Sequence, residues 1–123
     1  MDARYVFAVR FRLEPATEGV SVAPDEFETR LSRGADPPGE DGWLFFRDNL
    51  WRGEINDERH FRRLTEQALG ATVVSVEYRA LETDEEYLAA LRDEIRDDLG
   101  TFRADSVSEV LNKYLGSSIE VQK

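Results

Sequence analysis

The chain has 123 residues and a mass of 14.1 kDa, the size of one domain that can bury its own core. It contains no cysteine, which excludes disulfides, thiol nucleophiles and cysteine-built zinc sites. Its 26 acidic residues outnumber its 16 basic ones, and the net charge is -10. Composition therefore predicts a single acidic domain and excludes several classes of enzyme.

The basic residues are unusual in kind, because only Lys113 and Lys123 are lysines and the others are arginines. An acidic excess with so little lysine is typical of proteins adapted to concentrated salt, where hydrated carboxylates maintain solubility and ions screen their repulsion. We therefore expect a halophilic, cytoplasmic protein. We expect neither a secretory signal nor a membrane span, because charged residues interrupt every apolar stretch.

Alternation of apolar and polar residues predicts one strand over residues 5–13 and another over residues 27–32. The odd positions of the first strand form its apolar face. An alternative for the second segment is a short helix that begins at Asp25 or Glu26. Residues 33–42 contain three glycines and two prolines, and this composition predicts a loop.

The segment GWLFFRDNLWRGE, residues 42–54, holds both tryptophans of the chain. We predict a hairpin in which Asp48 and Asn49 form the turn, since both residue types tolerate positive φ. In this register Phe46 and Trp51 lie on the covered, core-facing side of the sheet, and a slip of one residue would exchange the two faces. A plain extended strand without a turn is the alternative.

Three segments have the periodicity of amphipathic helices, and each is followed by a glycine. The first begins at Asn56 or Asp57 and runs to Leu69. The second begins at Thr83 and the third at Ser106, each with a glutamate three residues later, as in a capping box. The positions predicted to be buried are Phe61, Leu64 and Ala68, then Tyr87, Leu88, Leu91, Ile95 and Leu99, then Val107, Val110, Leu111, Tyr114 and Leu115.

A further strand is predicted over residues 72–80, with Val74, Val76 and Tyr78 facing the core. The tail, residues 117–121, could add a short edge strand. This order of elements predicts an α+β fold, in which helices pack on one face of a mostly antiparallel sheet and form a two-layer domain. Residues 1–123 are expected to form one domain.

Few residues of the sequence are candidates for catalysis or for binding a metal ion or a phosphate group. His60 is the one histidine, and only Glu54 and Asp57 accompany it as nearby metal ligands, a weak match to a transition-metal site. Asp57 is better explained as a helix cap. The carboxylates of residues 84–98 fall on a solvated helix face, and no phosphate-binding loop is present. We therefore expect no catalytic residue, no metal and no cofactor.

What remains is a set of arginines and aromatic rings assigned to the polar face of the sheet. These candidate binding residues are Arg10, Arg12, Trp43, Phe45, Arg47, Arg52 and Arg79. At about 1 M salt the Debye length is only about 3 Å, so such a surface would hold a partner by stacking and bidentate arginine pairs. The alternative is a solvated face on which Glu28, Glu54 and Glu77 pair with these arginines.

The leading hypothesis is a non-enzymatic binding or protein-interaction module that uses this surface around Leu50-Trp51-Arg52 and takes an unidentified protein or a small acidic ligand. The alternative is an RNA-contacting domain that uses the same surface. A small enzyme or metal site around His60 comes third. The oligomeric state is not predicted.

Leu50-Trp51-Arg52, with FRDN before it and GE after it, resembles the signature of the LWR-salt family, small proteins of halophilic archaea. The segments RYVFAVRFRLEP and DPPGEDGWLFFRDNLWRGEI are also similar to that family, so the resemblance covers essentially the whole chain. It implies a salt-rich habitat and a shared fold. It implies no activity, cofactor or catalytic residue.

Overall fold

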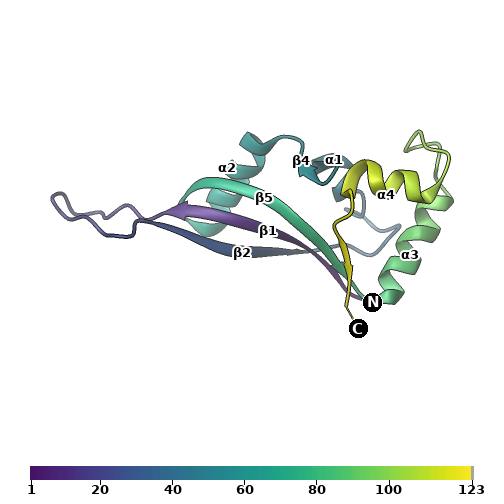
Figure 1. Cartoon of the computed structure of the whole chain (residues 1–123), viewed down its shortest axis with the longest axis horizontal. Coiled ribbons are helices and arrows are strands. Elements are labelled where there is room, and N and C mark those ends of the chain that lie inside the picture. Colours follow the sequence, from purple (N-terminus) through teal and green to yellow (C-terminus); the bar gives the residue numbers. More distant parts are fainter. Residues whose placement is uncertain (123) are drawn as a thin grey trace.

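The computed structural model describes residues 1–122, which form three long strands, three short strands and four helices (Figure 1). The strands are β1 (Ala3–Arg12), β2 (Glu26–Gly34), β3 (Leu50–Trp51), β4 (Glu54–Ile55), β5 (Thr72–Thr83) and β6 (Ile119–Val121). The helices are α1 (Phe45–Asn49), α2 (Glu58–Leu69), α3 (Glu85–Arg96) and α4 (Val107–Leu115). Within the described part of the chain no helix is long and apolar enough to cross a membrane.

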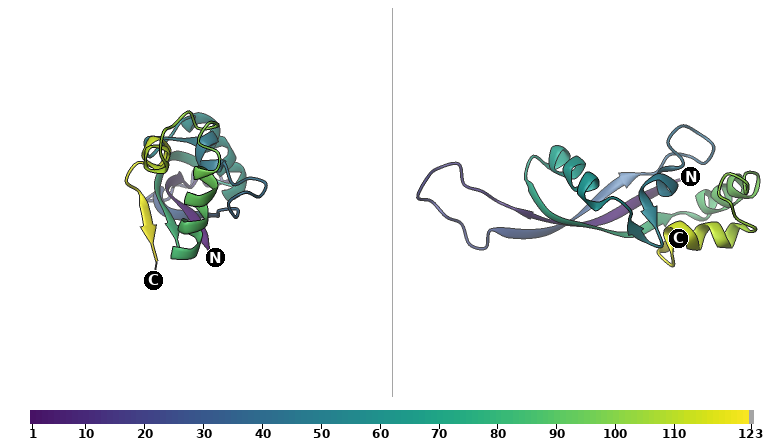
Figure 2. Two further views of the ribbon diagram at one scale, coloured as in Figure 1. Left: turned by 90° about the vertical axis from the view of Figure 1, so that its right-hand side faces the viewer. Right: turned by 90° about the horizontal axis from the view of Figure 1, so that it is seen from above.

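The main sheet has the strand order β2-β1-β5-β6, in which only the β5-β6 pair is parallel. Strands β3 and β4 form a separate two-stranded ribbon. Helix α2 lies along β5, while α1, α3 and α4 are grouped at the other end of the molecule (Figures 1 and 2). The predicted α+β fold with a mostly antiparallel sheet is therefore confirmed, including the short strand in the tail.

One hydrophobic core holds these layers together. Strand β1 contributes Tyr5, Phe7 and Val9 from its helix-facing side, and all three are buried. Phe46 of α1 is fully buried and stacks on Phe102 with ring centroids 5.9 Å apart. Since burying such a side chain contributes roughly 1.5–3 kcal/mol, these rings fix α1 between the sheet and α4.

The predicted turn at Asp48-Asn49 is wrong. These two residues lie in α1, where the Asp48 amide donates to the Leu44 carbonyl at 3.1 Å and the Asn49 side chain donates to the Phe45 carbonyl at 3.0 Å. The turn falls instead at Arg52-Gly53, where φ is 52° and 79°. Glycine at the second position explains the shift, because this tight turn needs positive φ at both central residues.

Two of the three core positions predicted for β5, Val76 and Tyr78, are buried, and the third is not, because two bulges change the alternation of the strand. Register shifts opposite Val6/Phe7 and Arg10/Phe11 leave one extra β5 residue at each place, namely Arg79 and Val74. Val73 is consequently the buried core residue, and Val74 is only half-buried. A bulge inserts one residue into one strand, and period-two patterning alone cannot locate it.

Two further helix details differ from the prediction. Leu64 is 45% exposed and Ala68 is also exposed, because α2 lies along β5 and leaves one side of its apolar stripe uncovered. Helix α3 is capped by Asp84, whose carboxylate accepts the Tyr87 amide at 2.7 Å, while Thr83 is the last residue of β5. The predicted cap at Ser106 is confirmed by its 3.1 Å bond from the Glu109 amide.

The connection between β1 and β2 is the most extended part of the molecule. Residues 13–25 reach well beyond α2 and the rest of the sheet (Figure 1). Strand pairing continues into this connection, since the Leu13 amide donates to the Asp25 carbonyl at 2.8 Å. Val20 and Val22 near its tip are exposed.

Candidate binding site

Leu50 and Trp51 of the tripeptide Leu50-Trp51-Arg52 form strand β3, and Arg52 is the first residue of the turn that connects β3 to β4. Leu50 pairs with Ile55 and is fully buried, and Trp51 pairs with Glu54. The next residue, Arg52, has a φ of 52°, in the left-handed region that arginine rarely occupies. The sequence thus places three neighbouring side chains in three different environments: core, surface and strained turn.

The turn is anchored on the carboxyl end of α4. The Arg52 amide donates to the Lys113 carbonyl at 2.8 Å, and the Gly53 amide donates to the Tyr114 carbonyl at 2.9 Å. These bonds satisfy carbonyls that a helix leaves without partners in its last turn. Gly53 favours the close approach, because a Cβ there would lie 3.3 Å from the Leu115 carbonyl oxygen.

The Trp51 side chain is 43% exposed and lies near two cations. The Arg52 guanidinium carbon lies 5.7 Å from the indole centroid, and the Lys113 ammonium nitrogen lies 5.9 Å from it. Both distances fall within the range of cation–π attraction. Glu109, Asn112 and Gly116 line the same shallow depression. We call Trp51, Arg52 and Lys113 the LWR surface.

Lys113 is fixed in this position by a second contact. Its ammonium group donates to the Phe102 carbonyl at 3.0 Å. This bond ties α4 to the segment that follows α3, and it holds the cation near the ring. Lys113 is therefore held beside the indole by a contact outside the LWR surface.

A family model described as LWR-salt protein matches residues 1–123. The chain belongs to the LWR-salt protein family. The match covers the whole chain, so it includes both the β3-β4 ribbon and the helix on which the ribbon is anchored. No curated protein and no solved structure matches it.

Of the candidate residues around the ribbon, only Arg52 lies on the LWR surface. Trp43 is half-buried with its ring edge-on to Phe46 at 6.2 Å, so it is mainly part of the core. Phe45 is half-buried in α1, 4.6 Å from the Tyr5 ring. Arg47 pairs with its neighbour Asp48 at 3.1 Å. The helical path of residues 45–49 separates these side chains from the turn.

Arg10, Arg12 and Arg79 lie on the sheet, away from the LWR surface. Arg12 pairs with Glu26 at 2.9 Å, and Arg79 pairs with Glu77 at 3.1 Å. Arg10 is exposed and lies opposite Glu28 in the β1–β2 ladder, but among residues 1–122 no carboxylate lies within ion-pair distance of it. The predicted single surface of arginines and rings is not formed, because the rings lie on the helix side of the sheet.

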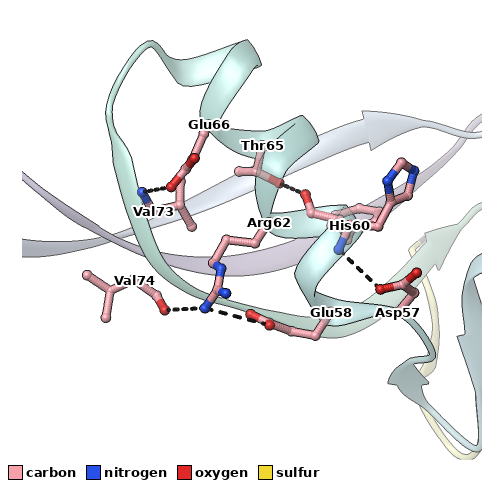
Figure 3. Close-up of polar contacts among 9 residues, drawn as sticks. Asp57, Glu58, His60, Arg62, Thr65, Glu66, Val73 and Val74 are labelled. Carbon is pink, nitrogen blue, oxygen red and sulfur yellow. Dashed lines mark hydrogen bonds and ion pairs between the residues drawn. The ribbon is translucent and has the colours of Figure 1, made fainter.

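The region around His60 has the geometry of a helix cap. The Asp57 carboxylate accepts the backbone amide of His60 at 3.1 Å, which satisfies one of the free donors at the start of α2 (Figure 3). In the part of the chain described, no three histidine, aspartate or glutamate side chains gather as metal ligands. Asp57 therefore has the capping role that the sequence favoured for it.

The shifted pKa values belong to other parts of the molecule. Burial raises the pKa of Tyr78 and of Tyr87 to about 12 and raises the pKa of Tyr5 further. Hydrogen bonds from the Tyr87 and Asp2 amides lower the pKa of the Asp84 carboxyl. These shifts arise from core packing and helix capping.

Sequence reasoning identified neither Trp51, which it assigned to the core, nor Lys113 as a residue of the LWR surface. The sequence distinguishes Lys113 only as one of two lysines in a chain whose other basic residues are arginines. Its position beside Trp51 follows from the anchoring of the turn on α4, a contact between segments far apart in the sequence.

Proposed function

We propose that this protein is a non-enzymatic binding module and that the LWR surface is its contact site. The observation that carries the proposal is the 43% exposed Trp51 ring, whose centroid lies 5.7 Å from the Arg52 cation and 5.9 Å from the Lys113 cation. Exposed aromatic rings beside arginine are typical of residues that dominate binding energies at interfaces.

The conformation of Arg52 supports a role beyond folding. A tight turn with positive φ at both central residues favours asparagine or glycine at its first central position. Arginine in the left-handed region costs about 1–2 kcal/mol relative to these choices. The turn therefore has no structural need for the Arg52 side chain, and a contact with a partner supplies a reason for it.

The partner that fits this chemistry is an acidic protein segment with an apolar or aromatic side chain beside its carboxylates. A carboxylate can take two hydrogen bonds from one guanidinium, and an apolar group can cover the indole. Both are short-range contacts, which remain effective when salt screens longer-range attraction.

The alternative partner, RNA, has weaker support. A long polyanion would approach a chain with a net charge of -10, and Glu109 lies within the same depression as the two cations. The uncovered face of β1, β2 and β5 presents no aromatic side chain for base stacking, although Arg10 is exposed there.

The setting we propose is a salt-rich cytoplasm. The support is compositional: 26 acidic residues and almost no lysine among the basic ones. Under these conditions a small surface of stacked and bidentate contacts is the effective way to select a partner.

A fluorescence titration tests the proposal. In a Trp43→Phe variant, Trp51 is the one remaining tryptophan and reports on its own surface. We expect a peptide of alternating glutamate and phenylalanine to change its emission saturably in molar potassium chloride, whereas a matched lysine and phenylalanine peptide does not. Saturation with oligouridylate alone would favour the RNA alternative. No saturable change with any probe would contradict the proposal.

A further inference from the structure

The two edges of the main sheet differ in whether their outward backbone groups have hydrogen-bond partners. At the β5 edge, β6 pairs with residues 81–83. Farther along the same edge, the Arg62 side chain donates to the Val74 carbonyl at 3.4 Å, and the Glu66 carboxylate accepts the Val73 amide at 3.0 Å (Figure 3). Side chains of α2 thus occupy backbone groups of β5 that could otherwise pair with another strand.

The opposite edge, β2, has no such protection among residues 1–122. Its nine residues pair with β1 without a register shift and include no proline. All of them except Leu31 are exposed. Long regular edge strands without a bulge, a proline or a covering element can pair with another strand, and the charged residues of β2 restrict this pairing to a strand of complementary charge.

The backbone groups that β2 leaves unpaired can be identified from the ends of its ladder. The Leu13 amide bonds the Asp25 carbonyl, and the Ala35 amide bonds the Ala3 carbonyl, so the odd-numbered residues of β2 face β1. Antiparallel pairing alternates along a strand. The amides and carbonyls of Glu26, Glu28, Arg30 and Ser32 therefore point away from the sheet.

We propose that β2 pairs in antiparallel fashion with β2 of a second copy of this chain, about a two-fold axis at Thr29. In this register Glu28 lies opposite the partner's Arg30 and exchanges both outward backbone hydrogen bonds with it. Asp25 lies opposite the partner's Arg33. By symmetry each opposite-charge pair occurs twice, so the strand is complementary to itself.

Neighbouring registers are less complementary. An axis at Glu28 would pair Glu26 with the partner's Arg30 but would also place the two Glu28 side chains opposite each other. An axis at Arg30 would place the two Arg30 side chains opposite each other, and like charges destabilise a strand pair. An axis at Leu31 would bring no opposite charges together. Charge pairs at a rim define register more than they add affinity, and this is the role the sequence of β2 gives them.

Apolar side chains on the helix side of β2 supply the remaining contact. Phe27, which is 37% exposed and stacks on Phe11 at 5.8 Å, would lie opposite the partner's Leu31. Leu31 and the exposed Leu64 line an apolar groove between β2 and α2. Pairing would therefore cover part of the apolar surface that α2 leaves open. The projecting residues 13–25 of each copy would extend beside the partner's loop after β2.

Cysteine cross-linking tests both the contact and its register, because the natural chain has no cysteine. At the proposed axis the two Thr29 residues form a non-hydrogen-bonded pair with Cα atoms about 4.5 Å apart, within disulfide range. Two Ser32 residues would be about 20 Å apart. We expect Thr29→Cys to form a disulfide dimer on mild oxidation and Ser32→Cys, the matched control on the same strand, to remain reduced.

Light scattering of the wild-type chain gives a second measurement. We expect a mass about twice 14.1 kDa in molar potassium chloride. Arg30→Glu should shift this mass to the monomer, and Glu28→Arg combined with Arg30→Glu should restore the dimer. A monomeric wild type, or equal cross-linking of Thr29→Cys and Ser32→Cys, would overturn the proposal. Both readouts are independent of the LWR surface, so they do not depend on the proposed function.

Discussion

The indole of Trp51 packs edge-on against the ring of Tyr114, with centroids 5.9 Å apart and planes at 81°. This contact joins the β3-β4 ribbon to α4 and leaves the other side of the indole accessible, since Trp51 is 43% exposed. An exposed ring held by a specific aromatic contact has a defined orientation. Trp51 is therefore a positioned surface residue, and the expectation that it lies in the core is wrong.

Trp51→Ala tests this assignment through stability. We expect a loss of about 1–2 kcal/mol in the free energy of unfolding, from partial burial and the Tyr114 contact. Phe46→Ala, at a fully buried position of the same aromatic group, should cost about 3–5 kcal/mol. Denaturant titrations of both variants measure the difference. Equal losses would show that Trp51 is a core residue.

The turn conformation gives a prediction for Arg52. Because its φ is 52°, we expect Arg52→Gly to keep or raise the free energy of unfolding, by up to about 1 kcal/mol. Arg52→Val should lower it by about 1–2 kcal/mol, since a branched side chain fits the left-handed region poorly. The comparison requires denaturant titrations under identical salt. A stability loss with glycine that matches the loss with valine would contradict the turn geometry.

Sequence patterns predicted the long strands, the helices and the sheet-on-helix architecture because these depend on periodicity and local caps. Asp57 and Ser106 act as the caps that were expected, through hydrogen bonds to amides three residues later. The ribbon was misplaced because two turn signals competed within residues 42–54. The glycine at position 53 determined the turn, while Asp48 and Asn49 joined a short helix.

The candidate site was only partly predictable for a different reason. Arg52 was identified from its position beside tryptophan in an acidic chain. Lys113 was not, because its proximity to Trp51 depends on the anchoring of the turn on α4. Bulges at Val74 and Arg79 likewise changed which β5 side chains share a face. Such tertiary relationships have no periodic signature in one sequence.

Burial of Tyr78 predicts a loss of stability at high pH. Burial raises its pKa from 10.0 to about 12, so the folded chain holds this proton more tightly than the unfolded chain does. The contribution of the protonated Tyr78 hydroxyl to the free energy of unfolding is constant below pH 10, and it is lost as the pH rises toward 12. We expect unfolding midpoints to fall over this interval, and Tyr78→Phe to reduce the slope. An unchanged slope in the variant would show that other groups cause the loss.

His60 gives a prediction of little effect. Its side chain is exposed, and the cap at the start of α2 uses its backbone amide. We expect His60→Ala to change the free energy of unfolding by no more than about 0.5 kcal/mol. Added zinc should shift the melting temperature of wild type and variant equally. A zinc-dependent stabilisation seen only in the wild type would revive the metal hypothesis.

The most direct test of the LWR surface combines binding and stability in one variant. Arg52→Gly, made in the Trp43→Phe background, keeps the Trp51 reporter and relaxes the turn. We predict that it binds the glutamate and phenylalanine peptide at least tenfold more weakly, about 1.4 kcal/mol, while its free energy of unfolding is unchanged or higher. Peptide affinity equal to that of the Trp43→Phe parent would contradict the account and leave the tripeptide with a structural role.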